Sequence, residues 1–144
     1  MKYTTEIIIE KPLQEVVNKM HSTENMKHWQ EGFISFEHLA GEAGTEGATS
    51  LLKYKMGKRE MEMKETIIKH DLPAEFSARY EAKGVWNEVY NYFTVVDKNT
   101  TVWESEVIFK FKGFMKIIAF LMPGSFKKQT YKFMQAFKKF AEQS

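Results

Sequence analysis

The period of the hydrophobic pattern changes twice along this chain, and these changes constrain the fold more than any other sequence feature. Residues 3–10 alternate between apolar and polar side chains, which is typical of a strand with one drier face. A helical stripe follows, then a long run of alternating segments, and finally an amphipathic helix. This order predicts an α+β fold in which a curved antiparallel sheet grips one long helix around an apolar cavity.

Two short helices are predicted between the first strand and the second. Pro12 suits the first turn of a helix, because its missing N–H has no partner to lose there. One helical stripe then carries Leu13, Val16, Val17 and Met20. A second helix, over residues 24–30, places Met26 and Trp29 on one side.

Six further strands are predicted from the period-two alternation that begins at Phe33. They lie near residues 33–40, 48–56, 60–70, 75–82, 85–96 and 100–111. Glycine, proline, asparagine and aspartate mark the breaks between them. The breaks are short, whereas parallel crossovers need about a dozen residues or more, so we expect an antiparallel meander.

The last segment opens with an apolar stretch, Phe114–Met122, and is interrupted at Pro123-Gly124. Beyond the interruption, one arc of the helix carries Phe126, Thr130, Phe133, Met134, Phe137, Phe140 and Ala141. Lysines occupy a largely opposite arc. This pattern is typical of a helix that packs on an apolar surface while its lysines remain in water.

Composition favours a single domain over residues 1–144, because 43% of the residues are hydrophobic and the length fits one core. Cysteine is absent, so no disulfide or thiolate site is expected. The net charge of +2 gives no case for nucleic acid, and no apolar run approaches the roughly 20 residues that span a bilayer. No segment resembles a signal peptide, and we expect a cytoplasmic protein.

The layout of the chain resembles that of the START/Bet v 1-like superfamily, also called the SRPBCC or polyketide-cyclase-like group. The similarity covers essentially the whole chain and lies in the order of its elements, since no single motif is diagnostic. It rests on Ile7-Ile8-Ile9 before Lys11-Pro12, on the Val16-Val17 helix, on Trp29, on the hairpin at residues 97–100, and on the final Phe/Lys helix.

The resemblance implies a helix-grip fold, in which a seven-stranded curved antiparallel sheet wraps around the C-terminal helix and leaves a ligand cavity between them. Members bind lipids, sterols, polyketides or plant hormones, others cyclise polyketides, and some assist chaperones. The group has no universal catalytic residues, so none is carried over to this chain, and we expect no cofactor. Fold alone does not define function.

The predicted cavity lining depends on the hairpin at residues 97–100. If the hairpin loop has two or four residues, then Trp86, Glu88, Tyr90 and Tyr92 lie on the same face of the sheet as Trp103. A three-residue loop would place these four residues on the opposite face. Adopting the first register, we expect the lining to be Trp29, Tyr54, Met63, Glu65, Trp86, Glu88, Tyr90, Tyr92, Trp103, Ser105, Phe109, Met115 and Met134. Mostly apolar walls with a few polar groups are typical of small-ligand pockets. The alternative is a filled core in which the tyrosine hydroxyls reach solvent.

Glu65 is a carboxylate on an otherwise apolar strand face, which it shares with Met61, Met63 and Ile67. It is either a polar anchor or general acid in the cavity, or a strand-end residue paired with a lysine or arginine, which we favour. Glu88 and Ser105 are expected to orient a polar group of the ligand. The four histidines lack metal-site spacing, and neither a phosphate loop nor a nucleophile elbow is present, so we expect no metal.

Three functional hypotheses follow. The first is a carrier or sensor that binds a hydrophobic or amphiphilic small molecule, with Phe114–Met122 as a hinged lid. The second is a cyclase, dehydratase or hydrolase that uses Glu65 or Glu88 with a tyrosine. The third is a protein-interaction module of the chaperone-assisting type. The lysine face of the last helix could contact anionic lipid headgroups, although such a face is usually just solvated. Either a monomer or a homodimer is compatible with the sequence.

Overall fold

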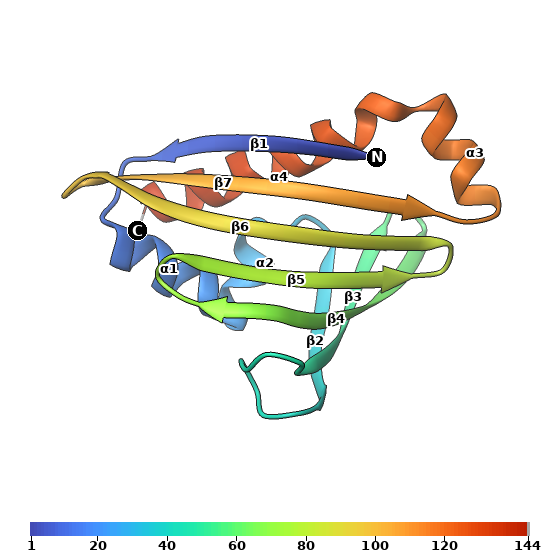
Figure 1. Ribbon diagram of the computed structural model, residues 1–144, viewed down its shortest axis with the longest axis horizontal. Coiled ribbons are helices and arrows are strands. Elements are labelled where there is room, and N and C mark those ends of the chain that lie inside the picture. The colour runs from blue at the N-terminus through green and yellow to red at the C-terminus, as the bar shows by residue number, and fades with distance from the viewer. Residues whose placement is uncertain (144) are drawn as a thin grey trace.

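Seven antiparallel strands form one sheet in the computed structural model, which describes residues 1–143. The strands are β1 (Lys2–Ile9), β2 (Phe33–Ala40), β3 (Thr49–Met56), β4 (Arg59–Asp71), β5 (Glu75–Ala82), β6 (Val85–Asp97) and β7 (Thr100–Phe111). Their order across the sheet is β1-β7-β6-β5-β4-β3-β2, so β2 to β7 form the expected meander and β1 joins its far edge. Figure 1 shows the sheet bending between β5 and β2.

The helices occur where the sequence predicts them. They are α1 (Leu13–His21), the 3₁₀ turn η1 (Thr23–Asn25), α2 (Met26–Trp29), α3 (Phe114–Leu121) and α4 (Pro123–Gln143). In Figure 1, α4 runs along β1, which it contacts, while α3 extends past the end of β7. Within residues 1–143, no helix has both the length and the apolar character needed to span a bilayer.

Aromatic packing anchors α4 to the sheet. Phe137 is 0% exposed, and its ring centroid lies 5.1 Å from that of Trp29 on α2 and 5.4 Å from that of Trp103 on β7. Other buried members of this cluster are Ile7, Ile9, Val16, Val17, Phe93, Met134 and Ala141. The predicted apolar arc of the last helix is therefore the face that packs, and the space beneath its C-terminal half is solid.

A second, smaller cluster lies on the other part of the sheet. Its buried members are Met26, Leu52 and Tyr54, and partly buried side chains around it are Phe33, Phe36, Met63 and Tyr80. Helix α4 makes its main contacts with β1, α1 and α2, while α1 packs against β6 and β7 and α2 contributes Met26 to this cluster. In the described part of the chain, β4 and β5 are the strands on which no helix packs closely. The apolar core is thus divided into two parts.

The predicted face of β6 is wrong, and a β-bulge is the reason. Asp97 pairs with Thr100 across a two-residue turn, as expected, but the next pair is Val95 with Thr101. Val96 is therefore an extra residue in β6, and one extra residue moves every preceding side chain to the opposite face. Trp103 consequently lies opposite Phe93, and the outer, convex face carries Trp86, Glu88, Tyr90 and Tyr92.

Replacing Phe137 by alanine is expected to lower the free energy of unfolding by about 3–5 kcal/mol, because it removes a ring from between two tryptophans. Phe120→Ala on α3 is the matched control, since Phe120 is 84% exposed and its loss should change stability by less than about 0.5 kcal/mol. Denaturant unfolding of both variants measures the difference. Equal losses would contradict the assignment of Phe137 as the anchor of α4.

Candidate functional site

A row of four polar side chains crosses the concave face of the sheet. Ser50, Glu65, Tyr80 and Asn87 come from β3, β4, β5 and β6, and each is the direct cross-strand partner of the next. We call these four residues the polar row. Apolar pairs flank it on both sides: Leu52 with Met63 and Ala82 with Val85 on one side, and Ile67 with Ala78 and Ala78 with Val89 on the other.

Glu65 is buried in the middle of β4, with 7% of its surface exposed. Its carboxylate accepts a hydrogen bond from the Tyr80 hydroxyl. Burial raises the pKa of Glu65 above its ordinary value, and the hydrogen bond from Tyr80 only partly offsets this effect. The favoured sequence interpretation, a strand-end glutamate paired with lysine or arginine, is therefore wrong in both position and partner.

Two tyrosines beside Glu65 remain protonated at neutral pH. Burial is the main cause that raises the pKa of Tyr80 and of Tyr54, and the negative charge of Glu65 raises both further. The Tyr54 hydroxyl donates to Gln30 Oε1 at 2.5 Å, which links β3 to the end of α2. Both hydroxyls are therefore hydrogen-bond donors held in fixed positions.

Asn87 supplies an acceptor that has no partner within the described chain. Its Oδ1 atom is buried without a hydrogen bond, although buried polar atoms are nearly always paired. By contrast, Asn91, four residues further along β6 on the same face, accepts a hydrogen bond from Trp103 Nε1 at 2.9 Å. The inward-facing Thr5 hydroxyl likewise donates to Met134 Sδ at 2.9 Å. The Oδ1 atom of Asn87 is thus a buried acceptor of the polar row that makes no hydrogen bond within the described residues.

The surroundings of the polar row are open. We call this region the open concave face, and its partly exposed side chains are Tyr80, Val85, Asn87, Val89, Phe109 and Phe111. An apolar hollow beneath the last helix was expected, but the core fills the space under the C-terminal half of α4. What remains beyond it is a concave surface that solvent reaches rather than a sealed chamber.

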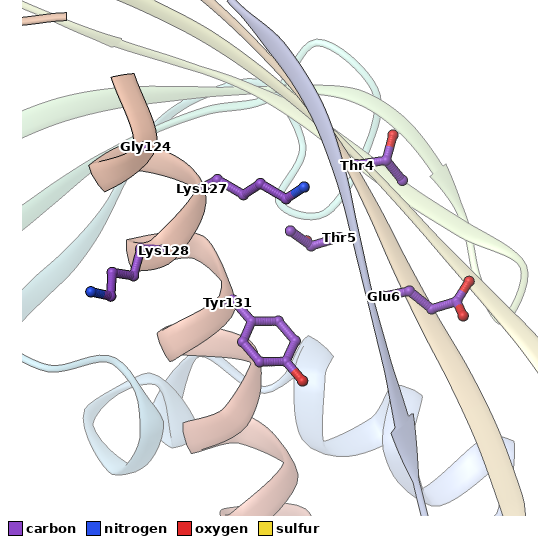
Figure 2. A pocket seen from close by; sticks show the side chains of 7 residues that line it. All are labelled: Thr4, Thr5, Glu6, Gly124, Lys127, Lys128 and Tyr131. Carbon is purple, nitrogen blue, oxygen red and sulfur yellow. The ribbon is translucent and has the colours of Figure 1, made fainter. Parts of the chain in front are cut away.

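Two clefts are present elsewhere on the described surface, and neither is lined by the polar row. One, of about 460 Å³, lies between β1 and the first turns of α4. Figure 2 shows that Thr5 points toward α4 across this cleft, while Thr4 and Glu6 project from the other side of the strand. The second, of about 300 Å³, lies around α2 and the start of β2.

The thirteen predicted lining residues fall into four groups. Those on the inner face near the polar row are Tyr54, Met63, Glu65, Ser105 and Phe109. Those packed into the solid core are Trp29, Trp103 and Met134. Those on the convex face are Trp86, Glu88, Tyr90 and Tyr92. Met115 lies on α3, close to Gly84 in the β5–β6 turn.

The convex group has partners of its own. Trp86 lies between two cations, with Arg79 Cζ at 5.1 Å and Lys110 Nζ at 4.5 Å from its ring centre. Glu88 accepts a hydrogen bond from Arg79 Nη2 at 3.4 Å. Glu88 therefore does not face the concave surface, and its predicted role in orienting a ligand there is wrong.

Sequence reasoning missed Tyr80 and Asn87, which the structure places at the centre of the site. The alternation Ala78-Arg79-Tyr80-Glu81 does place Tyr80 on the less charged face of its strand. Asn87 could not be assigned without the bulge at Val96, because that bulge decides the face of every residue on β6. The structure also brings His21 and His70 together, with ring centres 5.1 Å apart, a contact that sequence spacing does not reveal.

Comparison with known proteins shows the fold. No protein-family model matches the chain, and no curated protein matches it in sequence. A conserved protein from Geobacillus kaustophilus has a TM-score of 0.82 at 16% identity, over 100% of this chain and 97% of its own. Ara h 8.0201 has a TM-score of 0.77 at 12% identity, over 100% and 99%. The ZhuI aromatase/cyclase from Streptomyces sp. R1128 has a TM-score of 0.77 at 11% identity, over 99% and 93%.

The class of fold is thus defined: this chain has the helix-grip fold, which it shares with these three solved structures. Its seven-stranded antiparallel sheet, long C-terminal helix and short helices after β1 confirm the fold expected from the sequence. The identities are too low to carry any residue's role from these proteins to this one.

Glu65→Gln is expected to raise the midpoint of thermal unfolding at pH 7. With a folded-state pKa above the ordinary value of 4.5, the Glu65 carboxyl holds its proton more tightly in the folded chain than in the unfolded chain. Its contribution to stability is complete below pH 4.5 and is lost as pH rises through the raised pKa. Glutamine does not ionise, so the variant does not lose this stability as pH rises. Its side-chain oxygen can still accept the hydrogen bond from Tyr80.

The wild-type and Glu65→Gln curves of stability against pH should therefore converge below about pH 4 and separate above it. Glu60→Gln, an exposed change on the same strand, is the control and should follow the wild-type curve. A variant that is less stable than the wild type at pH 7 would contradict the assignment.

Proposed function

We propose that this chain binds a hydrophobic or amphiphilic small molecule on the open concave face, as a carrier or sensor. The observation that carries the proposal is the unpaired, buried Oδ1 of Asn87 beside the hydrogen-bonded pair of Tyr80 and Glu65. A buried acceptor without a partner is costly, and a ligand hydroxyl or N–H group would remove that cost.

The pattern of side chains supports a ligand with one polar group and an apolar remainder. The polar row crosses the concave face at a single place, and aliphatic and aromatic side chains flank it. Convergent polar groups within apolar walls are typical of small-molecule sites. The ligand's polar group would lie at Asn87, and its apolar part would lie along Val85, Val89 and Phe111.

We expect the protein to bind 1-naphthol more tightly than naphthalene, since only naphthol can donate a hydrogen bond to Asn87. In Asn87→Leu this preference should fall by about five- to tenfold, the effect of one hydrogen bond. Naphthalene should bind the variant at least as well, because leucine adds apolar surface. Titrations that follow tryptophan or ligand fluorescence measure both affinities.

Tyr80→Phe and Tyr90→Phe provide a matched pair for the same titrations, because the two tyrosines project from opposite faces of the sheet. Tyr80→Phe should alter naphthol affinity, since it frees the Glu65 carboxylate, whereas Tyr90→Phe should not. Naphthol binding that is unchanged by Asn87→Leu and by Tyr80→Phe would refute the proposed site. Native mass spectrometry of the purified protein then shows whether a ligand has co-purified with it, as added mass on the intact protein.

A second candidate function is an enzyme of the cyclase, dehydratase or hydrolase type. The observation that favours it is the buried Glu65 with its raised pKa, next to two protonated tyrosines. Such a carboxyl can serve as a general acid, with a tyrosine as hydrogen-bond donor to the same substrate. The ZhuI aromatase/cyclase shares the fold, which makes aromatic polyketides the first substrates to test. Turnover that survives Glu65→Gln would exclude this mechanism.

A further inference from the structure

Within residues 1–143, one face of α3 packs against no other part of the chain. Phe120 is 84% exposed and Phe114 is 73% exposed, and more than half of the surface of Ile117, Leu121 and Met122 is also in water. We call these five residues the apolar face of α3. The opposite side of the helix, with Met115, Ile118 and Ala119, is partly or fully buried. Contiguous apolar side chains of this size on a surface indicate an interaction site.

The segment that carries this face has charges of one sign only. Residues 107–141 contain eight of the chain's 21 basic residues, all lysine, and none of its 19 acidic residues. Four of these lysines lie on α3 or close to its ends in the sequence, and all four are exposed: Lys112, Lys116, Lys127 and Lys128. The remainder of the chain has an excess of acidic residues, so the positive charge is concentrated at α3 and α4.

The cleft between β1 and α4 adjoins this region. Its α4 wall, which begins directly after the end of α3, is formed by Gly124, Lys127, Lys128 and Tyr131. In Figure 2 the ammonium group of Lys127 reaches across toward β1, while the carboxylate of Glu6 lies on the far side of the strand. The cleft therefore offers a cation to a negatively charged group beside the apolar face of α3.

We propose that α3 and its flanking lysines dock on an anionic phospholipid surface. The apolar face would enter the boundary between headgroups and acyl chains, and the lysines would lie at the level of the phosphates. Apolar and basic residues on one short helix are what binding to such an interface requires, and each lysine near the surface strengthens it. The inference is independent of the ligand proposed for the concave face.

Two other occupants fit less well. A second copy of the chain, joined through the same face by a two-fold axis, would bring the lysines of both copies together without a carboxylate from residues 107–141. Closure of α3 over the open concave face of the sheet would bury the apolar side chains but would give the clustered lysines no anionic partner. Of these three occupants, an anionic bilayer is the one that satisfies both the apolar and the basic side chains.

Vesicle flotation tests the proposal, with phosphatidylcholine vesicles that either contain or lack phosphatidylglycerol. The wild-type protein should float with the anionic vesicles and much less with the neutral ones. Added sodium chloride should weaken the binding, because exposed charges are screened within about 10 Å at 0.1 M salt.

Two matched pairs of variants separate the apolar contribution from the electrostatic one. Phe120→Ser and Lys116→Glu should each weaken binding to anionic vesicles at least about fivefold. Val96→Ser and Lys98→Glu make comparable changes at exposed positions of the β6–β7 hairpin, at the other end of β7, and should bind as the wild type does (Figure 1).

Three results would overturn the proposal. The first is equal binding to neutral and anionic vesicles, or no binding to either. The second is a lipid-free dimer that Phe120→Ser converts to a monomer, which would assign the face to a second copy. The third is a change in naphthol affinity on Phe120→Ser with unchanged vesicle binding, which would assign α3 to closure over the concave face.

Discussion

The packing of Phe137 between Trp29 and Trp103 is the contact on which the arrangement of this protein depends. It brings together α4, the short helix α2 and the strand β7, which are far apart in the sequence. This contact holds the C-terminal half of α4 over one end of the sheet, while Phe126, near the start of the helix, packs on Phe109 and Phe111 of β7. The concave surface of the middle strands is left accessible, and the candidate site lies there.

The polar row shows how an antiparallel sheet can assemble a site without any local motif. Its four residues come from four strands and are separated by 7 to 15 positions in the sequence, yet direct cross-strand pairing aligns them. Burial then gives the row its chemistry, since it raises the pKa of Glu65 and of both neighbouring tyrosines. The apolar rows on either side restrict polar contact to one place.

Much of the fold could be predicted because strand alternation, turn residues and the helical stripe are local signals. The interruption before Pro123 and the buried arc of α4, including Met134 and Phe137, also follow from residue periodicity. The site was harder to predict from the sequence. Which face of the sheet a strand residue points to depends on whether the number of residues between it and its hairpin partner is odd or even. A single bulged residue, Val96, reversed β6 and exchanged Trp86 and Tyr90 for Asn87 and Val89. No propensity argument identifies such a bulge.

The pairing of β1 with β7 has a consequence for the biosynthesis of this protein. Thr5 lies opposite Ser105 and Ile7 lies opposite Trp103, and among the described strands β1 pairs with β7 alone. During translation the first strand therefore has no partner until residues beyond 100 have left the ribosome, and α4 emerges later still. The strands of the meander from β2 to β7 can pair one after another as they emerge. The strand β1 therefore stays unpaired longest, and an unpaired strand is where contact with a chaperone is most useful.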